Sequence, residues 1–313
     1  MNIDQSNINE LLNKYIEFTN RICDEKKYPN NIKHVLYLII PAFVIKYGIK
    51  HENMILGCFE KIKIFISEKE DNNCTAFFTR IMKKSPEGTL PKYYTSKAVV
   101  LNQYKSASLV DMLDNIIHEF NHAVNSMINE IKYDDKTVSM RTGLSYMIYD
   151  INDLSRIKEK TSDITLEEII NTKQTEDIMN IIRSFAKYEV HNEEFNNTFY
   201  ALGHSIQGEY TSNAYYLQSF ICKELMKNKT FIPTVENLRF NGNVDDIAGW
   251  FDNITGIEGS YKKLTTLLEE ILHDEERLSK AKWFKNYKIG KIREKMRKTM
   301  EIIQEYENNC IFK

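Results

Sequence analysis

Apolar residues in the first 60 positions recur every three or four residues, the spacing of an α-helix. The most apolar stretch of the chain, VLYLIIPAFVI at 35–45, follows this pattern and is too short to span a bilayer. We therefore expect a buried helix here and no transmembrane segment.

The pattern then changes to short runs rich in branched and aromatic residues. We expect strands at 62–67 (IKIFIS), 75–81 (TAFFTRI) and 97–104 (KAVVLNQY) that form a small antiparallel sheet. Helical spacing returns at about 108–131. Beyond Arg141 we expect nearly all helix, with loops at GHSIQGEYTS and NGNVDD.

The composition bears on the partners of the protein and on its cellular location. The chain has 313 residues, 42 Lys and Arg against 44 Asp and Glu, and a formal charge of −2, so no global field attracts nucleic acid, and none is expected as a partner. The five cysteines are scattered without a CxxC pair, and the N-terminus has no apolar signal region. These features predict a cytoplasmic protein.

The segment DNIIHEFNHAVNS (114–126) carries the strongest chemical pattern. On a helix His118 and His122 lie one turn apart on the same face, so both imidazoles can bind one zinc ion. Glu119 is next to His118 and can approach a metal-bound water as a general base.

The alternative is an ordinary amphipathic helix whose polar stripe happens to contain these residues. No lysine or arginine occurs between Lys105 and Lys132, although the chain contains 42 of them. A solvated stripe normally carries lysine, so the pattern favours a metal site.

HEFNH resembles the HExxH signature of the zincin metallopeptidases, and the resemblance covers about 97–172. It implies a hydrolase: a zinc-dependent metalloprotease that cleaves a peptide or protein substrate and binds no cofactor other than Zn²⁺. In that superfamily a sheet precedes the helix, and its edge strand pairs with substrate. KAVVLNQY (97–104) stands where such a strand would be.

The resemblance also bears on the third metal ligand. The extension HxxGxxH is absent, since Asn125 and Ile128 occupy its glycine and histidine positions. Gluzincins instead use a glutamate from a downstream helix, and TLEEIINTKQTEDI (165–178) matches that pattern. By this register Glu168 is the ligand, and Glu167 is the close alternative.

Local chemistry leaves other interpretations of this segment open. Thr165 and Glu168 have capping-box spacing, and two glutamates in a first helical turn stabilise the helix dipole without any metal. Asp163 or Asp177 also remains open as the ligand. At the position where the family has an acid that orients a histidine, this chain has Asn171 or Thr172.

A zincin-type reaction also needs a donor to the oxyanion, and several downstream residues are candidates. They are His191, Tyr200, His204, Tyr210 and Tyr215. Arg141 could bind a substrate carboxylate, although an ordinary salt bridge is the favoured interpretation.

The segment 279–298 carries nine Lys and Arg against one Glu, with apolar residues between them. We interpret it as a packed helix with a solvated face, and contact with a membrane surface is the less favoured alternative. Two rival functions remain. One is a zinc-binding regulatory or toxin-like protein of zincin fold, and the other is a helical interaction protein with an accidental motif.

Together these features predict an α+β, predominantly α-helical fold. A small antiparallel sheet is followed by a zincin-type active-site helix and a helical C-terminal half. We expect an N-terminal subdomain, 1–160, with the sheet and the HEFNH helix. A helical C-terminal subdomain, 161–313, would supply the third ligand, and the two would form one catalytic unit.

Overall fold

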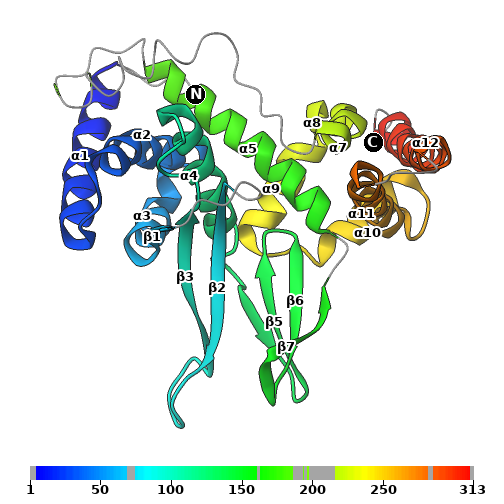
Figure 1. Ribbon diagram of the computed structural model, residues 1–313, viewed down its shortest axis with the longest axis horizontal. Helices are drawn as coiled ribbons and strands as arrows, with labels where there is room; N and C mark the ends of the chain where they lie inside the picture. The colour runs from blue at the N-terminus through cyan, green and yellow to red at the C-terminus, as the bar shows by residue number, and fades with distance from the viewer. Residues whose placement is uncertain are drawn as a thin grey trace. The chain divides into compact units, whose positions relative to one another are not determined.

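A computed structural model describes residues 5–68, 75–160, 163–185, 193, 196, 216–280 and 285–310 (Figure 1). Within them the fold is mixed α+β and mostly helical, which confirms the predicted class. The chain forms two compact units. The first combines Met1–Lys83, Thr95–Val124 and Gln174–Ser212, and the second combines Lys84–Tyr94, Asn125–Lys173 and Asn213–Lys313.

The first unit opens with three helices, α1 (Gln5–Lys26), α2 (Asn30–Tyr47) and α3 (Glu52–Lys61), with a short 3-10 turn, η1 (Ile49–His51), before α3. The apolar run predicted as a buried helix lies in α2, and almost all of its side chains are inaccessible to solvent. Among the described helices, none is by itself long and apolar enough to cross a bilayer. The α2 helix passes that test only together with Ile49–Lys61, and the two are bent by 111°.

The sheet of the first unit contains β1 (Lys63–Ile66), β2 (Ala76–Lys84) and β3 (Tyr93–Leu101) in the order β1-β3-β2. All three strands were predicted. However, β1 pairs with β3 in parallel, so the expectation of a purely antiparallel sheet was wrong. The segment expected as the edge strand, 97–104, falls largely in β3 at the centre, and in the described part of the chain β2 lies at an edge.

The motif helix is α4 (Leu109–Val124), and a capping box fixes its start. The Asp111 N–H donates to Ser108 Oγ, and the Ser108 N–H donates to Asp111 Oδ2, each at 3.1 Å. These bonds satisfy backbone donors that have no partner inside the helix. One face of α4 is buried, and the Phe120 ring stacks on Phe59 of α3 with centroids 4.3 Å apart. The predicted helix extended to 131, but α4 ends at Val124.

The next segment forms a second sheet that was not expected, so the prediction of nearly continuous helix beyond Arg141 was wrong. Its strands are β4 (Ile131–Tyr133), β5 (Thr137–Thr142), β6 (Ser145–Asp150) and β7 (Asp153–Lys160). They form an antiparallel meander in the second unit (Figure 1). Tight turns join neighbouring strands, and such short connections are typical of antiparallel pairs.

The remaining elements are helical, as expected. Helix α5 (Ile164–Ser184) is continuous, with its first ten residues in the second unit and the rest in the first. The second unit also contains α7 (Tyr216–Ile221), α8 (Lys223–Lys227), α9 (Phe231–Asn241), α10 (Asp246–Thr255), α11 (Ser260–Ser279) and α12 (Lys285–Cys310). Aromatic rings of Phe231, Phe251 and Tyr306 pack together in its core.

The turn between β5 and β6 requires glycine. Gly143 has φ +53°, a conformation that L-residues rarely adopt, and a methyl group added there would collide with the Glu167 carboxylate of α5. Glu167 is buried in an ion pair with Arg239 of α9. A side chain at position 143 would therefore strain the backbone and also displace a buried charge.

We expect Gly143→Ala to lower the free energy of unfolding by at least about 3 kcal/mol, because disrupting a buried ion pair costs about 3–5 kcal/mol. Urea denaturation of the purified variant measures this change. Gly256→Ala is the matched control, since Gly256 has φ +71° but no atom within 4 Å of an added methyl group. It should lose only the cost of the left-handed backbone, about 1–2 kcal/mol. Equal losses in the two variants would contradict the assigned contact.

Candidate metal centre

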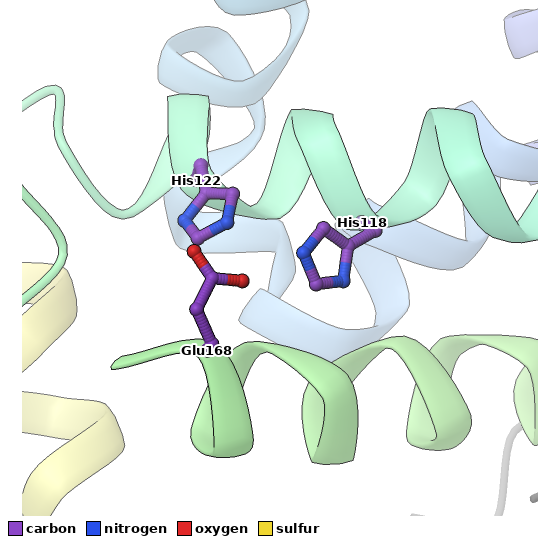
Figure 2. A group of neighbouring side chains, drawn as sticks. All are labelled: His118, His122 and Glu168. Carbon is purple, nitrogen blue, oxygen red and sulfur yellow. The ribbon is translucent and has the colours of Figure 1, made fainter. Parts of the chain in front are cut away.

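His118, His122 and Glu168 form a group that could hold a metal ion. Each offers one ligand atom, and these atoms all lie within 4.8 Å of one another. Figure 2 shows the Glu168 carboxylate on α5 directed toward the two imidazoles on α4. The three residues predicted as metal ligands are therefore brought together, from positions separated by 46 residues between His122 and Glu168.

The spacing suits a small divalent ion after minor side-chain adjustment. Donor atoms at the corners of a triangle with 4.8 Å sides lie about 2.8 Å from its centre. Zinc binds imidazole nitrogen and carboxylate oxygen at about 2.0–2.2 Å, so each side chain has to move inward by less than about 1 Å. Two nitrogens and one oxygen are a donor set that zinc accepts, with room for a further ligand.

Helix α4 positions both imidazoles by simple periodicity. His118 and His122 are one turn apart, and their ring centroids lie 5.0 Å from each other with the planes at 79°. His122 is 5% exposed, whereas His118 is partly accessible. The face of α4 that carries Phe120 is anchored in the core, which sets the direction in which the imidazoles point.

A buried polar chain joins α4 to α5 inside the first unit. The Tyr47 hydroxyl donates to Asn121 Oδ1 (2.9 Å), and Asn121 Nδ2 donates to Thr175 Oγ1 (3.2 Å). Thr175 follows Glu168 by seven residues, which is two helical turns, so both side chains lie on the same stripe of α5. The bond to Thr175 thus turns the stripe that carries Glu168 toward α4.

Glu119, the predicted general base, lies beside His118 and is 8% exposed. The N–H of Phe78 on β2 donates to Glu119 Oε2 at 2.6 Å. This hydrogen bond holds one carboxylate oxygen against the edge strand of the sheet. The Glu119 carboxylate therefore lies between β2 and α4, the helix that carries both histidines.

The structure assigns different surroundings to the two consecutive glutamates that the sequence left as alternatives. Glu167 is 1% exposed and accepts hydrogen bonds from Arg239 Nε (2.7 Å) and the Leu144 N–H (2.9 Å). Glu168 lies with the histidines instead. The register with Glu168 as the candidate ligand is therefore the one whose geometry suits a metal.

The two aspartates considered as ligands have other partners. Asp177 Oδ2 lies 2.7 Å from Lys46 Nζ. Asp163 accepts a hydrogen bond from Tyr261, whose pKa burial and this carboxylate raise well above the ordinary value of a tyrosine. Neither belongs to the group formed by Glu168 and the histidines.

Thr165 is not the cap of α5, because the helix begins at Ile164 and Thr165 is its second residue. Its N–H donates instead to Glu269 Oε1 at 2.7 Å, so a carboxylate from α11 satisfies the helix N-terminus. Of the two positions expected to orient a histidine, Asn171 accepts a hydrogen bond from Arg239 (2.8 Å). The Thr172 hydroxyl is buried without a hydrogen-bond partner.

Arg141 does not face solvent, which speaks against the expectation that it binds a substrate carboxylate. It is 0% exposed and donates to the carbonyl oxygens of Gly143, Ile128 and Arg239. The guanidinium fastens the β5–β6 turn to neighbouring backbone. The oxyanion candidates lie outside the described residues; they are His191, Tyr200, His204, Tyr210 and Tyr215.

Arg239 and the Phe78 amide were not predicted from the sequence. A signal for Arg239 was present, because it lies four residues after Val235 and eight after Phe231 on the buried stripe of α9. A cation on an apolar stripe needs a buried anion. A backbone donor such as the Phe78 N–H leaves no trace in residue types.

Comparison of the chain with known protein families, with curated proteins and with solved structures gave no match. The site must therefore be judged on its own geometry.

We expect the metal-free protein to bind one zinc ion per chain, and His122→Ala and Glu168→Ala to weaken this binding at least a hundredfold because each removes a donor. Competition with a chromogenic chelator measures the affinity. Asp177→Asn is the control, since its carboxylate pairs with Lys46 and should not contribute. Loss of zinc in the control, or its retention in Glu168→Ala, would contradict the assignment.

Proposed function

We propose that this protein is a zinc-dependent metallopeptidase that hydrolyses peptide bonds in a peptide or protein substrate. The observation that carries the proposal is the convergence of His118, His122 and Glu168, with Glu119 beside them on the same helix as the histidines. The resemblance of HEFNH to the zincin signature supports the same reaction. The Glu168 carboxylate of a distant helix close to both imidazoles favours a metal site over an accidental motif.

The donor set favours zinc over harder cations. Imidazole suits zinc, whereas magnesium and calcium prefer sites made of oxygen alone. When bound, zinc would polarise the scissile carbonyl and lower the pKa of a water molecule toward neutrality.

Glu119 is the residue that would move the proton. As a carboxylate it accepts a proton from the attacking water and then delivers it to the leaving amine. The hydrogen bond from the Phe78 N–H to Oε2 orients the carboxylate, because it fixes one oxygen against β2. The position of the Glu119 carboxylate is therefore defined by this hydrogen bond and by its burial.

The edge strand suggests how substrate would bind. An extended peptide adds to an exposed sheet edge through backbone hydrogen bonds. The edge strands of the first unit's sheet are β1 and β2, and β2 is the one whose Phe78 amide contacts Glu119. A peptide laid along β2 would therefore pass close to the proposed base.

The basic segment 279–298 is partly neutralised within the second unit, which favours the packed-helix interpretation. Lys295 pairs with Glu270 and Asp274 of α11, and Arg297 pairs with Glu294 and Glu301. We therefore infer no role for nucleic acid or a membrane surface, and we retain the cytoplasm as the proposed location.

We expect Glu119→Gln to bind zinc with wild-type affinity but to lose at least about a thousandfold in peptide cleavage, because an amide cannot accept the proton. Cleavage of a peptide library, followed by mass spectrometry, is the measurement. Zinc affinity in the same sample shows that the site is intact. Unchanged cleavage would remove Glu119 from the mechanism. A wild-type protein that binds zinc but cleaves no peptide would instead favour a zinc-binding regulatory protein.

A further inference from the structure

A fully buried charged cluster lies directly beside the candidate ligand Glu168. Arg239 of α9 is 0% exposed and contacts both carboxylate oxygens of Glu167. Its Nη2 also donates to Asn171 Oδ1 at 2.8 Å, one turn further along α5. The guanidinium thus bonds two residues on one side of α5, Glu167 and Asn171. All three residues belong to the second unit.

The β5–β6 turn also holds the Glu167 carboxylate. The Leu144 N–H donates to Glu167 Oε2 at 2.9 Å, and Gly143 leaves no side chain in the space that the carboxylate fills. The turn itself is fastened by Arg141, which donates to the Gly143 carbonyl. Glu167 is therefore held by two guanidinium nitrogens of Arg239 and by the backbone of the β5–β6 turn.

Net stability is a poor explanation for such an arrangement. Removing two charges from water costs about as much as their attraction returns, so a buried ion pair can often be replaced by apolar residues without loss. What a bidentate pair does provide is a defined orientation, since the planar guanidinium fits a carboxylate in one geometry.

We propose that Arg239 is a positioning residue for the metal centre: its ion pair with Glu167 fixes the rotation of α5 about its axis and so aims Glu168 at the imidazoles. The inference rests on the metal site of the proposed function. Consecutive side chains on a helix point about 100° apart, so fixing Glu167 fixes Glu168. Zinc tolerates errors of only about 0.2 Å in its ligand distances, which makes affinity sensitive to such a rotation.

The test removes both charges together, in the double variant Glu167→Gln and Arg239→Met. The introduced amide oxygen can still accept from the Leu144 N–H, and neither side chain is left as an uncompensated buried charge. We expect a folded protein with unchanged circular dichroism and a melting temperature no lower than wild type. Its zinc affinity, measured by chelator competition, should be about 10–100-fold weaker, the usual effect of losing a residue that orients a ligand. The visible spectrum of the cobalt-substituted protein should change as well, because it reports ligand geometry.

The matched control is Lys46→Met combined with Asp177→Asn, which removes both charges of another ion pair on α5. It should bind zinc within twofold of wild type. A loss in this control as large as that in the double variant would overturn the proposal, because the effect would not be specific to Glu167. A double variant that binds zinc within threefold of wild type, with the same cobalt spectrum, would overturn it too.

If the double variant does not fold, Arg239→Lys decides the question, because it keeps the charge and loses the planar fork. At least a tenfold loss of zinc affinity supports positioning, and a loss below threefold overturns it. A wild-type protein that binds no zinc overturns this inference together with the metal centre. A wild-type protein that binds zinc without cleaving peptides overturns the proposed peptidase and leaves the positioning role of Arg239 intact.

Discussion

The geometry of the candidate site depends on the angle of about 100° between consecutive side chains of an α-helix. Glu167 and Glu168 are chemically identical neighbours on α5, yet one is enclosed by a guanidinium and the other faces two imidazoles. The helix cannot exchange them without rotating, and rotation would break the contacts of Arg239. The two carboxylates therefore differ in the direction in which the helix points them, and this direction makes Glu168 the candidate ligand.

The environment of each carboxylate follows from this direction. Glu167 is almost fully removed from water and accepts hydrogen bonds from the Arg239 guanidinium and the Leu144 backbone N–H, so it is held in place inside the second unit. Glu168 keeps partial access to solvent, as does His118, which a catalytic metal site needs for exchange of its open position.

The features that could be predicted from the sequence are those that depend on the spacing of residues within a single helix. The His118–His122 spacing defines a helix face, and the apolar run in α2 defines a buried helix, so local periodicity was enough for both. The apolar stripe of α9 marks Arg239 as a buried cation, but its partner Glu167 is 72 positions away, and no local pattern identifies which carboxylate it pairs with. The second sheet was missed for a different reason. Its turn signals at Asp134 and Gly143 were present, but β7 is exposed on both faces and shows no alternation of polar and apolar residues.

The meander that connects α4 with α5, the helices of the candidate ligands, has four strands in the order β4-β5-β6-β7. Alternating directions bring the end of β7 back to the end of the sheet where β4 begins, three strand spacings or about 14 Å away. The Gly143 turn lies at this same end, and the other two turns lie at the opposite one. The even number of strands therefore sets the end of the sheet at which α5 begins. Longer strands at the far end would leave the starting point of α5 unchanged, whereas a single added strand would move it to the opposite end of the sheet.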